Sequence, residues 1–159
     1  MKRTLAVLVQ NQPGVLNRVA GLFSRRVYNI HSLNVGVTDD PEVSRMTIIV
    51  DGDEQIIEQV TKQLHKLIDV IKVSDITDDP SVDREMVLFK VKAEAAVRGE
   101  IMQIAEIFRS RIVDFSKKSM IIETTGDQGK LNAIENALKP FGIIEMVRTG
   151  VISMVRGSK

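Results

Sequence analysis

The chain has 159 residues, and its 22 Lys and Arg against 21 Asp and Glu give a formal net charge of +1. This balance argues against a dedicated nucleic-acid binder, which would carry a strong basic excess. The absence of Cys excludes disulfides, Cys-zinc sites and thiol nucleophiles, and two His leave little room for a His-rich metal site or a conventional triad.

Neither a membrane span nor a targeting segment is predicted. No apolar run approaches the roughly 18 residues that a membrane-spanning helix needs. The first apolar run, residues 5–9, is too short for the core of a signal peptide, and no small-residue cleavage site follows it. We therefore expect a cytoplasmic protein with no membrane partner.

The first half of the chain has the pattern of one small α+β domain. The β-branched run at 5–9 predicts a buried strand, and the breaker cluster 11–14 ends it. Apolar residues then recur at helical spacing over 15–23 and 56–68, and strand patterns cover 30–38, 46–50 and 70–76. The resulting order, βαββαβ, is that of the ferredoxin-like fold.

The second half repeats this order. A strand is predicted at 86–91, a helix at 97–108, a hairpin at 112–122, a helix at 131–141, and a long last strand at 143–155 that Gly150 interrupts. Polar turn formers cluster at 77–81. We predict an α+β chain of two tandem ferredoxin-like domains, residues 1–77 and 84–159, joined by a linker at 78–83.

The second strand of the first domain should lie at an edge of its sheet, because right-handed crossovers place the first strand between the third and the fourth. That edge carries Leu33, Val35 and Val37 and has no Lys, Arg or Pro to block pairing. We therefore predict that two chains pair along this edge into one eight-stranded sheet. The alternative is that the second half of the same chain covers the edge.

The segment from Asn11 to Leu16 is a candidate binding loop. Gly14 lets a ligand approach the backbone, and the first N–H groups of a helix favour a carboxylate. Asn11 offers an amide donor and an acceptor, and Pro13 suits an early helical position. Together these features suit the two charges of a free amino acid, although an ordinary helix start would use the same residues.

Two acidic pairs resemble metal ligands only superficially. Asp39-Asp40 and Asp78-Asp79 each precede a Pro, so turn formation explains them better than metal binding does. We predict no metal site in this chain.

Several segments resemble the small regulatory subunit of acetolactate synthase, also called acetohydroxyacid synthase. They are N-x-P-G-V-L at 11–16, G-L-F-S-R-R-x-Y-N-I at 21–30, T-D-D-P at 38–41 and S-R-M-T at 44–47. The likeness extends over nearly the whole chain. One departure is Val27, where the family usually has Gly; a left-handed residue at that turn would strain Val and alter effector affinity.

The resemblance implies a non-catalytic subunit whose first domain is an amino-acid-binding regulatory domain of the ACT type. Thiamine diphosphate, Mg²⁺ and FAD would belong to a large catalytic subunit, which condenses pyruvate with pyruvate or 2-oxobutyrate, and this chain would bind none of them. The small subunit would raise the activity of that partner and confer feedback inhibition by branched-chain amino acids, usually valine.

The resemblance also implies where the effector sits, namely between the ACT domains of a homodimer. Carried over to this sequence, one chain would contribute Asn11, Gly14, Val15 and Leu16, and its neighbour would contribute Asn29 and Ile30.

Three other interpretations of the sequence compete with this one. Gly14-Val15-x-x-Arg18 imitates the phosphate loop of an acylphosphatase-like enzyme, although one half of the chain would suffice for that fold. A stand-alone amino-acid-sensing ACT protein would share the same loop. An RNA-recognition module of this topology needs aromatic residues on its central strands, and 5–9 and 46–50 have none.

Overall fold

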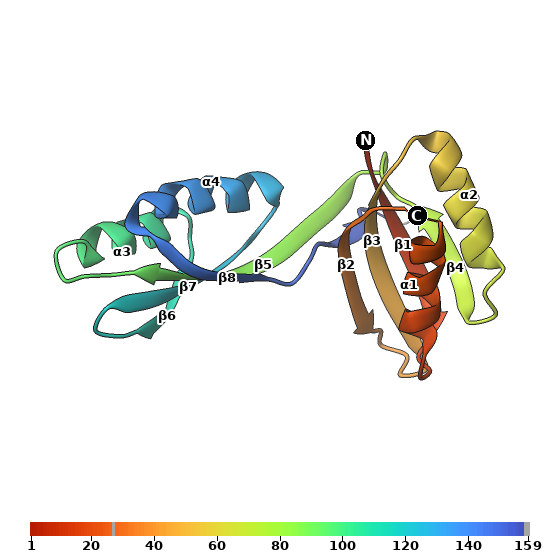
Figure 1. Cartoon of the computed structure of the whole chain (residues 1–159), viewed down its shortest axis with the longest axis horizontal. Helices are drawn as coiled ribbons and strands as arrows, with labels where there is room; N and C mark the ends of the chain where they lie inside the picture. Colours follow the sequence, from red (N-terminus) through yellow and green to blue (C-terminus); the bar gives the residue numbers. More distant parts are fainter. Residues whose placement is uncertain (27, 158–159) are drawn as a thin grey trace. The chain divides into compact units, whose positions relative to one another are not determined.

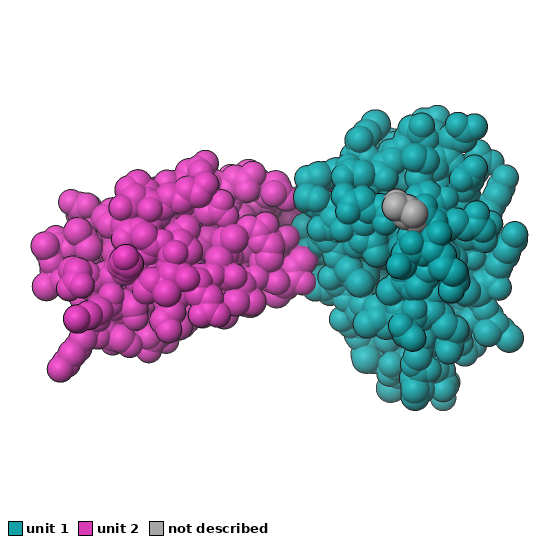
Figure 2. Space-filling model, in the orientation of Figure 1, with its two compact units in different colours: residues 1–82, 151–159 teal, residues 83–150 magenta. Residues whose placement is uncertain are grey.

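The computed structural model describes residues 1–26 and 28–157, which form two compact units (Figure 2). The first unit holds residues 1–82 and the C-terminal segment from Val151, and the second holds residues 83–150. The segment after Gly150 therefore packs with the first unit, whereas the sequence pattern assigned it to the second.

The first unit contains a four-stranded antiparallel sheet with strand order β2-β3-β1-β4 and two helices (Figure 1). Its elements are β1 (Lys2–Gln10), α1 (Val15–Arg25), β2 (Ile30–Val37), β3 (Val43–Asp51), α2 (Glu54–His65) and β4 (Val70–Asp75). The predicted βαββαβ order is confirmed, with β1 between β3 and β4 and with β2 at an edge.

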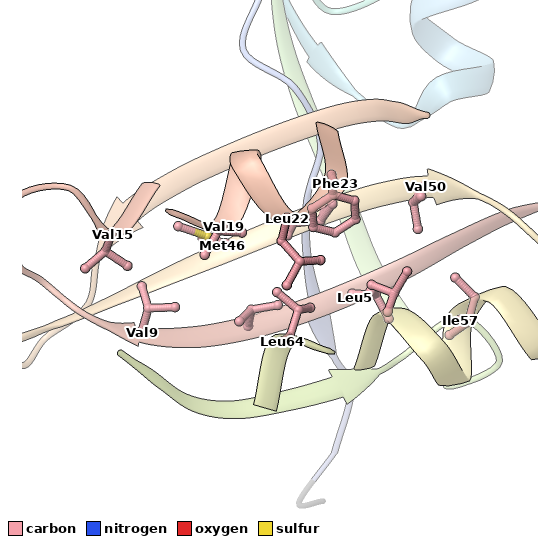
Figure 3. Packing of buried hydrophobic residues seen from close by; sticks show 13 residues of the cluster. Leu5, Val9, Val15, Val19, Leu22, Phe23, Met46, Val50, Ile57 and Leu64 are labelled. Atoms are coloured by element: carbon pink, nitrogen blue, oxygen red, sulfur yellow. The ribbon is translucent and has the colours of Figure 1, made fainter. Parts of the chain in front are cut away.

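Alternate residues of the central strands build the core of this unit. Leu5 lies opposite Ile48 and Val7 lies opposite Met46, and all four side chains are fully buried. Helices α1 and α2 cover this face of the sheet with further apolar side chains, namely Val15, Val19, Leu22, Phe23, Ile57, Val60 and Leu64 (Figure 3). Both helices are amphipathic, so packing against the sheet fixes their positions.

The second unit repeats this design with its own core. Its elements are β5 (Ser81–Lys92), α3 (Arg98–Ile107), β6 (Arg111–Phe115), β7 (Ser119–Gly126), α4 (Gln128–Leu138), a short 3₁₀ helix η1 (Lys139–Phe141) and β8 (Ile143–Arg148). The strand order is β6-β7-β5-β8, so the predicted hairpin forms and β6 takes the edge position of β2. Phe89, Ile101 and Met120 are fully buried in a cluster separate from the first.

The predicted last strand is two strands rather than one. Gly150, with a φ of +92°, separates β8 from β9 (Ile152–Val155), which pairs with β5. Arg45 of β3 donates from Nη2 to the carbonyl of Ser153 at 2.7 Å, and Ser153 is buried within the first unit. Within the described residues, β3 is the only strand that forms a ladder with β2. The N–H of Val151 donates to Oγ of Ser32 at 3.0 Å, and Nζ of Lys2 lies 2.9 Å from Nε2 of His31, so β2 also has side-chain contacts outside that ladder.

Candidate functional site

The loop between β1 and α1 ends in a left-handed residue. Gly14 is the N-cap of α1 and has a φ of +84°, a region that glycine occupies without a steric penalty. Helix α1 begins at Val15, so Pro13 precedes the helix and the prediction of an early helical position for it is wrong. No side chain caps α1 and its first turn has no acidic residue. The start of α1 therefore contributes no capping or acidic side chain to the positive end of the helix.

Asn11 anchors this loop to the turn between β2 and β3. Its backbone N–H donates to the carbonyl of Glu42 at 2.7 Å, and its side-chain amide donates to the carbonyl of Pro41 at 3.0 Å. One of the two N–H donors of the Asn11 side chain is therefore used within the chain, and its amide oxygen could accept an ammonium N–H.

The two apolar residues of the predicted site have different positions. Val15 is 3% exposed and belongs to the core, and its backbone N–H donates to the carbonyl of Gln12 at 3.4 Å, so its side chain is not available to a ligand. The Leu16 side chain is 47% exposed at the start of α1 and is available to a ligand.

Asn29 and Ile30 lie at the opposite end of the sheet from this loop. Ile30 is paired with Val50, and the carbonyl of Asn29 accepts the N–H of Asp51 at 3.2 Å, whereas Val43 of β3 is paired with Gln10. Seven residue steps along β3 at about 3.4 Å each separate the two ends by roughly 24 Å. One chain therefore does not bring the two parts of the predicted site together.

The edge strand β2 presents apolar side chains near the end that adjoins the candidate loop. Val35 is 40% exposed and Val37 is 59% exposed. Leu33 differs from them, because it is partly buried against the core of its own unit.

One charged pair beside the loop has no counterpart in the site expected from the sequence. Arg18 donates from Nε to Oδ2 of Asp69 at 2.7 Å. A Cβ placed on Gly14 would lie 3.0 Å from Nη1 of Arg18, so the guanidinium lies directly over the glycine. The sequence singled out Arg18 only as part of a phosphate-loop imitation. The spacing of four residues from Gly14, one helical turn, was the available indication of this contact.

The acidic pairs take part in local structure. The Asp40 carboxylate accepts the N–H of Glu42 at 3.0 Å within the β2–β3 turn, and Asp78 lies 3.7 Å from Arg3. Across residues 1–26 and 28–157, no three acidic or His side chains are grouped so that they could hold a metal ion. In the same residues, no helix has the length and apolarity required to cross a membrane.

Comparison with known proteins identifies the family of this chain. A family profile described as an AHAS small subunit-like ACT domain matches residues 5–72, and one described as the small subunit of acetolactate synthase matches residues 84–157. A probable acetolactate synthase small subunit of Archaeoglobus fulgidus is 56% identical over 159 residues, covering 100% of this chain and 99% of that protein. The chain belongs to the acetolactate synthase small-subunit family.

Two further relatives match this chain over its full length. The acetolactate synthase small subunit of Haemophilus influenzae is 49% identical over 100% of this chain and 98% of its own length. The crystal structure of the acetolactate synthase small subunit from Thermotoga maritima superposes with a TM-score of 0.92 at 41% identity, covering 100% of this chain and 99% of that one.

The membership confirms three sequence-based predictions: the family itself, the pair of ferredoxin-like units with an ACT domain first, and a non-catalytic regulatory subunit. The acylphosphatase-like interpretation is therefore abandoned. Val27, the departure noted in the sequence, lies outside the described residues, so its effect stays a prediction.

Proposed function

We propose that this small subunit binds the large catalytic subunit of acetolactate synthase, raises its activity and makes it sensitive to branched-chain amino acids, with valine as the principal effector. Thiamine diphosphate, Mg²⁺ and FAD would then belong to the large subunit. Family membership supports this assignment, and the open start of α1 supports an amino-acid carboxylate as the group bound there. The cytoplasmic location expected from the sequence stays a prediction.

The observation that carries the proposed effector site is the separation of its two parts within one chain. If two copies pair antiparallel along β2, a two-fold axis reverses the direction of the second strand. The Ile30 end of one copy then lies beside the Val37 end of the other, and this is the end at which Asn11 and Gly14 lie. A homodimer of this kind assembles two complete sites from four incomplete ones.

The expected affinity follows from the size of the effector. Valine has about 8 non-hydrogen atoms, and roughly −0.6 to −0.9 kcal/mol per atom gives about −5 to −7 kcal/mol. This range corresponds to a Kd between about 10 and 200 micromolar, which suits the sensing of a metabolite pool.

Reconstitution tests the proposal. The purified chain, supplied with thiamine diphosphate and Mg²⁺, should form no acetolactate alone but should raise the turnover of its cognate large subunit, and valine should then inhibit the complex. Calorimetric titration of the chain with valine, leucine and isoleucine ranks the effectors. Acetolactate formation by this chain alone, or no response of the large subunit to it, would refute the assignment.

A further inference from the structure

Helix α1 carries two arginines that stand over glycines one turn earlier. Arg18 overlies Gly14 and Arg25 overlies Gly21, with the would-be Cβ atoms 3.0 and 3.6 Å from the nearest Nη1. Long helical side chains lean toward the N-terminus of their helix, which explains both contacts. Only the first of these glycines lies in the candidate binding loop, and only there is the backbone left-handed.

A buried carboxylate fixes the guanidinium of Arg18 in this position. Asp69 is 7% exposed, and its carbonyl accepts the N–H of Gln10 at 2.8 Å, so the end of β1 holds Asp69 in place. Its Oδ2 accepts Nε of Arg18 at 2.7 Å. Because a guanidinium is a planar fork, a bond at Nε settles the direction in which the two Nη groups point.

The Nη groups of Arg18 remain available. Of the three guanidinium nitrogens of Arg18, only Nε has a hydrogen-bond partner among the described residues, and the Arg18 side chain is 48% exposed. Nη1 points over the glycine at which the effector would approach the backbone. Two fixed N–H donors with a full positive charge match the two oxygens of a carboxylate.

We infer that Arg18 binds the carboxylate of the amino-acid effector and that Asp69 is a positioning residue that orients it. This inference rests on the proposed function and names the side chain that recognises the acid group. It also accounts for the Gly14-Val15-x-x-Arg18 pattern, which here serves an organic carboxylate rather than a phosphate. The ligand class is therefore a free α-amino acid, and an analogue without the negative charge should bind poorly.

The test is calorimetry on the full-length chain with valine and with valinamide, which keeps the ammonium and isopropyl groups but lacks the carboxylate. Arg18→Gln should weaken valine binding about tenfold or more and leave valinamide within about twofold, because only the charged pair is lost. Arg18→Lys should recover part of the valine affinity. Asp69→Asn should fall between wild type and Arg18→Gln, since it keeps the cation but loosens it.

Arg25→Gln is the matched control, because it makes the same change on the same helix over another glycine. It should leave both affinities within about twofold of wild type. A merely structural Arg18 would change both ligands equally, so an unchanged ratio of valine to valinamide affinity in Arg18→Gln would overturn the inference. Inorganic phosphate that binds more tightly than valine in an Arg18-dependent way would also overturn it.

The outcome separates this inference from the function on which it rests. A wild-type chain that binds no branched-chain amino acid contradicts the proposed effector and this assignment together. A wild-type chain that binds valine, with an Arg18→Gln variant that binds it equally well, contradicts the role of Arg18 alone.

Discussion

The two units place an ion pair at the same position of the same topology, but with the charges reversed. In the first unit Arg3 donates from Nη2 to Asp75 at 2.7 Å, and in the second Nη1 of Arg148 lies 3.4 Å from Glu85. Arg3 and Glu85 each stand two residues before the residue that faces their partner, on β1 and β5, and each is 7% exposed. In both units, the buried charge on the first strand is paired with an opposite charge on the fourth strand, because an unpaired buried charge is costly whichever its sign.

The loops that start the first helix of each unit differ more deeply. Helix α1 begins after a left-handed Gly14 with no acid in its first turn, whereas α3 begins after Val97 in a right-handed conformation and has Glu100 in its first turn. The first turn of α3 thus supplies a carboxylate of its own, whereas the first turn of α1 supplies none and has Arg18, which pairs with Asp69 from outside the helix. The proposed effector site therefore depends on this one loop and its neighbours rather than on the fold that the two units share.

Gly14→Asp should have the largest effect on the site. The new carboxylate would pair with Arg18, which lies against this position, and would repel the carboxylate of the effector. Two like charges about 4 Å apart cost about 4 kcal/mol at an effective dielectric near 20. We expect a loss of about a thousandfold in valine affinity, measured by calorimetry and by inhibition curves, with activation of the large subunit retained.

Gly14→Asn is the control for this change. Asn has the same shape as Asp, and both tolerate the left-handed conformation that a φ of +84° requires. Asn should therefore lose much less affinity than Asp. Equal losses would mean that bulk or backbone strain at Gly14 decides the result, and full valine sensitivity of Gly14→Asp would place the effector elsewhere.

Breaking the edge of the first unit should have the next largest effect. Val37→Lys adds a charge to an exposed edge residue, and Val35→Pro removes a donor from the ladder. Each should shift the chain toward monomer in sedimentation and lower valine affinity at least about tenfold, because the proposed site needs both copies. Leu33→Lys is a poorer probe, since Leu33 also packs on its own core. A monomer that binds valine as wild type does would disprove the shared site.

The Arg3–Asp75 pair predicts a smaller, pH-dependent effect on stability. Burial alone would raise the pKa of Asp75, but hydrogen bonds from Thr77 and Arg3 outweigh it and hold this pKa below its ordinary value. The resulting stabilisation is present above the usual aspartate pKa of about 3.9 and is lost as the pH falls through the lower folded-state pKa.

Asp75→Asn should therefore lower the free energy of unfolding near neutral pH, by about 1 to 2 kcal/mol given the partial exposure of the carboxylate. The variant should approach wild type as the pH falls below about 4. Urea unfolding at a series of pH values measures both effects. A difference that is constant across this range would show that the charge of Asp75 contributes nothing.

The spacing of apolar residues predicted most of the fold, because the residues that β1, α1 and β3 bury recur at regular intervals in the sequence. It could not predict that the chain returns after Gly150, since residues 152–155 have a strand pattern whether they extend β8 or pack on the first unit. Nor could it predict the Arg18–Asp69 contact, which joins residues 51 positions apart. The sequence alone could not predict the left-handed conformation of Gly14, because glycine adopts positive and negative values of φ about equally readily.

The smallest expected effect is the most direct test of the contrast between the two loops. Ala96 is exposed in the loop before α3, the counterpart of the loop that holds Gly14. Ala96→Asp introduces the same charge as Gly14→Asp, at a helix start that already has an acid in its first turn. Because no effector carboxylate is expected there, valine affinity should change by less than about twofold, within the range of ordinary surface substitutions.

The two Asp variants, titrated with valine side by side, compare equal charges in equivalent loops. A large loss from Ala96→Asp would mean that the second unit also holds an effector, and that shared topology rather than the Gly14 loop determines where the amino acid binds.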